Sequence, residues 1–383
     1  MFTKFSNKLT MILPAVMLFM LAMLSGCSAQ DSDVGLLDDD EPIRFLVADD
    51  DTRGVYQAAK EMSEYAIYCF NTKTGKSYVA NAVQTKQPDD SWKSSRAISF
   101  PGKNALDFYA LKPGFKRDDV LELTMTVDEK SFVHTLPNAN YKQTDFMMSS
   151  LLDKTKEATG GTILFKFKHL FSYLRFQGKC SVEGLNVKIR SLTLHNLKST
   201  GKFTFSTTKE RDGSWELRDD MDNYTHLLPE EKELTDKKAM LHVADSMLFV
   251  MSQVPSVFTI TETTSFADAD ANKEAYLEIE CRIWKLADDG VTPQYIGCTE
   301  DSWAKVYYPL SATTKWQTNS SPYSGTYNVV LDYTGGYTYE GEDFLKKHTN
   351  GAMQMISIEP VQSFLVTNPW EDDDYNSQTL EMK

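Results

Sequence analysis

Residues 277–283 read Leu277-Glu278-Ile279-Glu280-Cys281-Arg282-Ile283, so apolar side chains alternate with charged ones along the stretch. Successive side chains of a β-strand point to opposite faces, and the alternation therefore predicts a strand with one buried and one solvated face. Asp289-Gly290 follows and predicts a hairpin turn, which would place Ile296 opposite Ile283 and Cys298 opposite Cys281. This register makes Cys281 and Cys298 candidates for a disulfide.

The same period of two residues recurs along most of the chain, at residues 43–47, 121–127, 163–167, 185–189 and 327–331. Leu192 and Leu194 continue the fourth run with its phase shifted by one residue, as a β-bulge would allow. Aromatic residues make up 12% of the chain, which also favours strands. Short helices are expected only at residues 147–158 and 230–240. The predicted fold class is all-β, with a domain boundary at Gly160-Gly161.

The N-terminus has the features of a signal peptide. Lys4 and Lys8 precede an apolar stretch at residues 11–24, which is short for a transmembrane helix. The stretch ends in Leu24-Ser25-Gly26-Cys27, which resembles the lipobox of bacterial lipoproteins. Cleavage between Gly26 and Cys27, with lipid added to the Cys27 thiol, would anchor the chain to a membrane. The alternative is an ordinary secretory signal that happens to end near a cysteine.

Charge restricts the partners of the exported chain. Residues 28–41 carry six acidic side chains and no basic one, which is typical of a solvated tether. The tether is either a plain linker or, by its resemblance to Bacteroidetes surface lipoproteins, a signal for export to the cell surface. The net charge is −14, to which residues 1–26 contribute +2, so the rest of the chain carries −16. Without a basic stripe to meet phosphates, no nucleic-acid partner is expected.

The sequence contains no recognisable catalytic motif. None of its six histidines lies three or four residues from another, so a helical metal pair is not expected. It has no phosphate-binding glycine-rich loop, no dinucleotide fingerprint and no Gly-x-Ser-x-Gly. The cysteine spacings match no zinc pattern, and Cys69 and Cys180 are expected to be small core residues. We therefore expect no enzyme activity, cofactor or metal.

Several segments, taken in order, resemble the fimbrillin family of Bacteroidetes pilus subunits. After the lipobox and a strand near residue 43 come Leu106-Asp107-Phe108-Tyr109-Ala110-Leu111-Lys112-Pro113, Thr144-Asp145-Phe146-Met147, Phe167-Lys168-His169-Leu170-Phe171-Ser172-Tyr173-Leu174, and Trp316 followed by Gly325-Thr326-Tyr327. Met148 departs from the family, which often has an aromatic residue there. The resemblance implies two tandem transthyretin-like β-sandwiches. They would occupy residues 42–159, with a removable first strand at 42–53, and 160–383, after the signal peptide (1–26) and the tether (27–41).

The resemblance also implies a mechanism of assembly. A surface-exposed lipoprotein of the outer membrane is cut by an Arg-specific protease, loses its first strand and receives a strand from a neighbouring subunit. Ile43, Phe45 and Val47 would fill the groove before cleavage. Cutting after Arg53 would release them, whereas cutting after Arg44 would split the strand. The alternative is that Arg53 is an ordinary loop arginine in a chain that is never cut.

The donor strand would come from the C-terminal region. Its apolar side chains would be those of Ile356, Ile358, Phe364 and Val366, although this segment could equally complete its own domain. The predicted function is a structural or adhesive subunit of a surface fimbria, with other pilus subunits as partners. The rival is a lipid-anchored surface protein that never polymerises, either an anchor subunit or a binder of a glycan or host protein. Exposed aromatic residues would support the binder, and the candidates are Trp92, Trp215 and Trp303.

Overall fold

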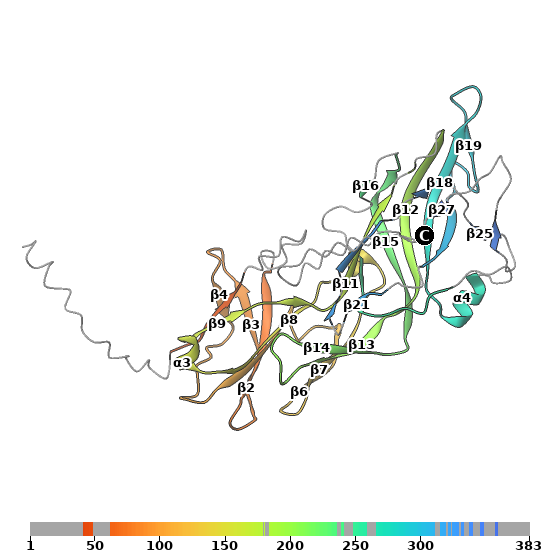
Figure 1. The fold of residues 1–383 in the computed structure, drawn as a ribbon. Helices are drawn as coiled ribbons and strands as arrows, with labels where there is room; N and C mark the ends of the chain where they lie inside the picture. The colour runs from red at the N-terminus through yellow and green to blue at the C-terminus, as the bar shows by residue number, and fades with distance from the viewer. Residues whose placement is uncertain are drawn as a thin grey trace, which may run out of the picture. The chain divides into compact units, whose positions relative to one another are not determined.

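The computed structural model describes residues 41–48, 62–178, 180, 184–235, 239–240, 248–258, 266–310 and 315–318, followed by short stretches at 321–322, 324–328, 331–332, 337–339, 345–347 and 357–358. These residues are almost all strands and turns, which confirms the all-β prediction (Figure 1). Several predicted site residues lie outside the described residues: Gly26, Cys27, Arg53, Ile356, Phe364 and Val366. No described helix is long and apolar enough to span a bilayer.

The first large sheet is antiparallel and has the strand order β10-β8-β5-β2-β3-β4. Its strands are β2 (Glu64–Asn71), β3 (Ser77–Lys86), β4 (Trp92–Ser94), β5 (Leu106–Lys112), β8 (Met147–Lys154) and β10 (Lys168–His169). The strand β5 is apolar on both faces: Phe108 packs into one hydrophobic cluster, whereas Tyr109 and Leu111 pack into another. A strand covered on both faces is expected to read as a continuous apolar run.

A four-stranded sheet follows in the order β14-β13-β7-β6. It contains β6 (Val120–Met125), β7 (Lys130–Thr135), β13 (Thr200–Phe205) and β14 (Gly213–Leu217). The pairing of β7 with β13 joins strands from either side of residue 160. The domain division at 159–160 stays a prediction.

The largest sheet runs β15-β12-β18-β20-β25-β26, and β19 pairs with β18 (Figure 1). These strands are β12 (Leu185–Lys198), β15 (Met221–Glu233), β18 (Tyr276–Leu286), β19 (Pro293–Tyr295), β20 (Ala304–Pro309), β25 (Tyr337–Tyr339) and β26 (Leu345–Lys347). The predicted bulge is confirmed, because the register of β12 shifts between Ile189 and Ser191. The shift keeps Ile189, Leu192 and Leu194 all in the core.

The remaining elements are short. A further sheet joins β11 (Ser172–Gly178) to β16 (Ala239–Met240), β17 (Leu248–Val250) and β23 (Ser324–Asn328). Two small pairs are β21 (Gln317–Thr318) with β22 (Ser321–Pro322), and β24 (Leu331–Asp332) with β27 (Ser357–Ile358). The described helices are η1 (Asn140–Lys142), α3 (Lys156–Thr159) and α4 (Phe266–Asn272).

Both predicted helices are largely wrong. Most of residues 147–158 form β8, and only α3 at its end is helical. The described start of the second predicted helix continues β15 as far as Glu233. Met147 to Ser150 are buried in β8, which pairs with β5 on one edge and with β10 on the other. Sheet pairing therefore outweighs local helix propensity here.

The hairpin after β18 confirms part of the expected register. Gly290 adopts a positive φ of 70° in the turn, and Ile296 N donates to Ile283 O at 2.8 Å. The expected pairing of the two cysteines is wrong, because Cys281 opposes Ala304 of β20 and not Cys298. The chain adopts a positive φ of 66° at Gly297, directly before Cys298. Cys281 and Cys298 are both free thiols, and Cys69 and Cys180 are buried, as predicted.

Candidate functional site

The first described strand is held by backbone hydrogen bonds on both edges. The strand β1 (Arg44–Val47) runs parallel to β9 (Thr162–Phe165), with Phe45 paired to Ile163. At its start Ile43 N donates to Ile98 O at 2.6 Å, and at its end Ala48 N donates to Phe165 O at 2.8 Å. β1 therefore lies between residue 98 and β9, which follows it by more than a hundred residues in sequence.

Residues 43 to 45 alternate between buried and exposed side chains, as their spacing predicts, whereas Leu46 and Val47 are both partly buried. Ile43 and Phe45 are buried (6% and 4% exposed), whereas Arg44 between them is exposed. The Phe45 ring lies 6.1 Å from each of the rings of Phe108 and Phe165, measured between centroids. Val47 is partly buried against the same cluster. Burying each large apolar side chain contributes about 1.5–3 kcal/mol, so this short strand completes part of the core.

The N-terminal segments that carry the family resemblance meet at a buried charge cluster. His169 Nδ1 donates to Asp145 Oδ1 at 2.7 Å, and Lys112 Nζ lies 3.7 Å from Asp145 Oδ2. The side chains of Asp145 and His169 are only 4% and 2% exposed. Burial opposes ionisation of Asp145, but the charges and hydrogen bonds of His169 and Lys112 outweigh it and lower the pKa of this carboxyl.

The C-terminal segments of the resemblance also meet. Ser172 Oγ, at the start of β11, donates to Trp316 O at 2.6 Å, and Trp316 is fully buried. Further along β11, Leu174 pairs with Gly325 of the parallel strand β23. The motifs around Ser172, Trp316 and Gly325 are therefore in contact through β11.

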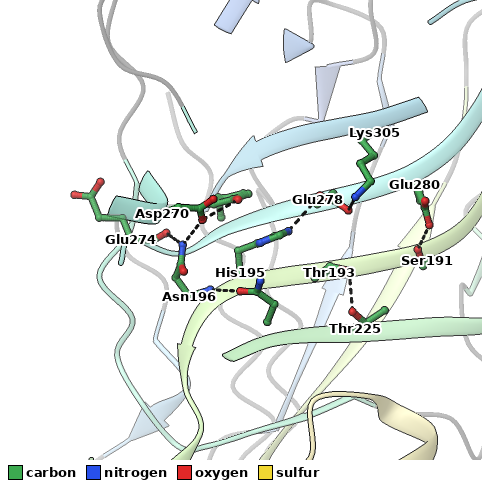
Figure 2. Close-up of polar contacts among 12 residues, drawn as sticks. Ser191, Thr193, His195, Asn196, Thr225, Asp270, Glu274, Glu278, Glu280 and Lys305 are labelled. Carbon is green, nitrogen blue, oxygen red and sulfur yellow. Dashed lines mark hydrogen bonds and ion pairs between the residues drawn. The ribbon is translucent and has the colours of Figure 1, made fainter. Parts of the chain in front are cut away.

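A second charge cluster lies on β12, β18 and β20 (Figure 2). His195 Nε2 lies 3.3 Å from Glu278 Oε2, and Lys305 Nζ lies 3.0 Å from Glu278 Oε1. Burial opposes ionisation of Glu278, but its contacts with His195 and Lys305 outweigh that and lower its pKa. The His195 ring stacks on Tyr276 with 4.3 Å between centroids.

The neighbouring polar side chains in Figure 2 are ordered by hydrogen bonds. Asn196 Nδ2 donates to Asp270 Oδ1 at 2.9 Å and to Glu274 O at 3.0 Å, which ties β12 to α4 and the residues after it. Burial raises the pKa of Tyr276, whose hydroxyl donates to the same Asp270 oxygen. These contacts join the ends of β12 and β18 to α4.

The three tryptophans that the sequence suggests as exposed binding residues differ in their surroundings. Trp215 Nε1 donates to Leu170 O at 2.8 Å, and its ring packs against the main core. Trp92 packs edge-on against Tyr65 at 4.8 Å between centroids. Trp303 lies instead beside two guanidinium groups, those of Arg190 and Arg282. Of these three tryptophans, only Trp303 is both partly exposed and in contact with arginine side chains.

The described residues include no cluster of metal-binding side chains. No group of three or more His, Cys, Asp or Glu side chains among them has the arrangement to hold a metal ion. The buried His169–Asp145 pair resembles part of a catalytic triad, but its side chains are closed off from solvent. Both residues belong to motifs of the family resemblance, but the sequence did not predict their contact. They are 24 positions apart, and no local pattern joins them.

The arrangement of sheets is similar to that of a solved β-protein. A solved fimbrial protein from Bacteroides vulgatus is similar, with a TM-score of 0.51 at 15% identity over 82% of this chain and 99% of that one. A putative cell adhesion protein from Bacteroides uniformis (TM-score 0.40, 12% identity, 81% and 98% covered) and the fimbrial anchor protein Mfa2 from Porphyromonas gingivalis (TM-score 0.34, 10% identity, 89% and 98% covered) are more distant in structure. No curated protein matches.

The family follows from the sequence model that this chain matches. Residues 49–281, more than half of the chain, match the model described as fimbrillin-like. The chain therefore belongs to the fimbrillin-like family, which confirms the resemblance read from its motifs. Membership places it among fimbrial and adhesin subunits of the cell surface. The matched region begins just after β1, the strand whose side chains complete the core around Phe108 and Phe165.

Proposed function

We propose that this chain is a subunit of a cell-surface fimbria, exported as an outer-membrane lipoprotein through Cys27 and assembled by strand exchange at β1. The observation that carries the proposal is that Phe45 of the short strand β1, together with the preceding Ile43, is buried in the core. Family membership supports the fimbrial class. The role is structural and adhesive, and we propose no enzymatic one.

The contacts of β1 are of the kind that another strand can reproduce. Its backbone pairs with β9, and its alternate side chains enter the cluster that contains Phe108. A strand from a second subunit with apolar residues at the same spacing would restore both sets of contacts. Loss of β1 without a replacement would expose apolar surface, and this cost would favour assembly.

The cleavage position is proposed at Arg53 rather than Arg44. Arg44 N donates to Gly161 O at 2.9 Å, and its neighbours Ile43 and Phe45 are anchored in the core. Proteases cut exposed, locally unfolded segments, so the paired backbone protects Arg44. Cleavage after Arg53 would also remove the whole strand.

The donor strand is proposed within residues 356–366. Of its four apolar residues, only Ile358 is described, and its backbone pairs with Leu331 in the small β24–β27 pair. Donation by Ile356, Phe364 and Val366 to a neighbouring subunit would give the fimbria its main contact between subunits. A Phe364→Asp variant would then export normally but would not enter polymers.

The experiment is mass spectrometry of the N-terminus of the protein recovered from the cell surface. Strand removal requires an unlipidated chain beginning at Gly54, and Arg53→Gln should abolish that species while the matched Arg44→Gln leaves it unchanged. Cys27→Ser should prevent surface anchoring before assembly. A wild-type population that consists only of chains lipidated at Cys27 would contradict strand exchange.

That contradicting outcome would instead favour the second candidate function, a lipid-anchored surface protein that does not polymerise. The partly exposed Trp303, with arginines beside it, is the observation that favours a binding role for such a protein. Its ligand would be a glycan or a host protein. Anchor subunits would give the same lipidated N-terminus but would co-purify with fimbriae.

A further inference from the structure

The solvated face of β18 carries an arginine without a carboxylate partner among the described residues. Arg282 Nε donates to Ser302 O at 3.2 Å, and its guanidinium carbon lies 4.4 Å from the centroid of the Trp303 ring. The described ion pairs of this face involve Glu278 and Glu280 and leave Arg282 out. A partly exposed guanidinium without a carboxylate keeps its terminal N–H groups available for a ligand.

The carboxylates nearest in sequence already have partners. Arg190 Nε donates to Glu280 Oε2 at 2.8 Å, and Ser191 Oγ donates to the same oxygen at 2.9 Å. Glu278 is paired with both Lys305 and His195, as Figure 2 shows. Arg282 is therefore a cation without a carboxylate partner among the described residues of this face, as is its cross-strand neighbour Lys188 of β12.

Trp303 orders this cation before any ligand arrives. The guanidinium carbon of Arg190 lies 4.9 Å from the Trp303 centroid, so the indole contacts both arginines. The turn before Trp303 is fixed by a hydrogen bond of 2.8 Å from Thr299 N to Ser302 Oγ. An ordered side chain loses less conformational entropy on binding, which makes this arginine a better anchor than a freely moving one.

We propose that Arg282 and Trp303 form a binding site for an anionic saccharide. The planar guanidinium presents two parallel N–H groups to one carboxylate or sulfate group, a geometry that lysine cannot supply. Trp303 makes no described hydrogen bond, and its partly exposed indole offers an N–H donor and an apolar edge to the sugar ring.

The surroundings favour a saccharide over a polypeptide. β18 is an interior strand, bonded to β12 on one edge and to β19 and β20 on the other, so it offers no edge for strand addition. Glu300 and Asp301 are exposed in the turn before Trp303 and would repel a highly acidic chain. A sugar with a single anionic group is repelled less, and it can bind to side chains without pairing with a strand backbone.

The test is calorimetric titration of the purified full chain with three probes: 3′-sialyllactose, 3′-sulfolactose and lactose. Binding of either anionic probe at least about tenfold tighter than lactose supports the proposal, because hydrogen bonds to charged groups are stronger than those between neutral groups. The two anionic probes distinguish a carboxylate from a sulfate ligand. Equal affinity for lactose, or no binding of either anionic probe, would overturn the proposal.

Variants locate the site. Arg282→Gln should weaken binding of the anionic probe about tenfold or more, and Arg282→Lys should weaken it less, because the charge remains but the paired N–H groups are lost. The matched control is Arg96→Gln, an exposed arginine on another strand connection, which should change nothing. Asp301→Asn should tighten binding. Unchanged affinity in a folded Arg282→Gln variant would place the ligand elsewhere and overturn the assignment.

The inference uses no residue of β1 and does not depend on strand exchange. A chain that fails to polymerise would still bind the anionic sugar, and a polymerising chain that fails to bind would leave the fimbrial proposal intact.

Discussion

A histidine, a carboxylate and a lysine meet at two places among the described residues. In the cluster of Lys112, Asp145 and His169, the carboxylate side chain is 4% exposed and the lysine 18%. In the cluster of His195, Glu278 and Lys305, the corresponding values are 10% and 51%. The same chemistry is thus placed once within a core and once at the edge of solvent, and the cost of leaving a charge without its partner should differ accordingly.

The largest expected effect comes from removing the buried carboxylate. Asp145→Ala would leave His169 and Lys112 without a counter-ion in a region where water cannot replace it. Breaking a buried ion pair typically costs about 3–5 kcal/mol, and we expect a loss of that size in the free energy of unfolding. Urea unfolding at neutral pH measures it. A loss below about 1 kcal/mol would show that the cluster is solvated or readily repacked.

The matched change in the other cluster should cost less. Glu278→Ala removes the partner of Lys305, but this lysine is half exposed and can be hydrated instead. We expect a loss of about 1–2 kcal/mol, in the range for a hydrogen-bonded charge at a partly buried site. The same urea measurement applies. A loss as large as that of Asp145→Ala would contradict the comparison, since burial would then not decide the cost.

How far the sequence predicts these features depends on the distance between the interacting residues. The alternation in residues 277–283 predicted β18, and the phase shift near Leu192 predicted the bulge in β12. Both are local patterns. The run from Met147 was wrongly assigned as helix, because the strand pairing that determines it comes from β5.

The sites show the same limit. The alternating burial of Ile43 and Phe45 followed from their spacing, whereas their parallel partner β9 could not be predicted because no local signal joins strands so far apart. Likewise, Asp145 and His169 were noted for their motifs, and only the pairing of β8 with β10 explains their contact. The site at Arg282 and Trp303 needs the register between β18 and β20.

Acid should weaken the cluster around Asp145. The folded-state pKa of Asp145 is lowered, so its stabilisation is complete above the unfolded pKa of about 3.9 and is lost as pH falls through the lower folded value. The wild type should therefore lose more unfolding free energy between pH 5 and about pH 2.5 than Asp145→Asn does. Urea titrations of both proteins across that range measure the difference, and parallel curves would contradict the lowered pKa.

The smallest expected effect is that of Lys305→Met. Lys305 is half exposed, and exposed ion pairs contribute about 0–1 kcal/mol, because hydration replaces much of the attraction. Glu278 would keep His195 as a partner, so we expect a loss of no more than about 1 kcal/mol, and less at high salt. Lys112→Met provides the matched comparison, since Asp145 would keep only His169 inside the core and its greater desolvation should make the loss larger. Equal losses in the two methionine variants would mean that Asp145 is compensated by groups other than Lys112, and burial would no longer explain the difference between the clusters.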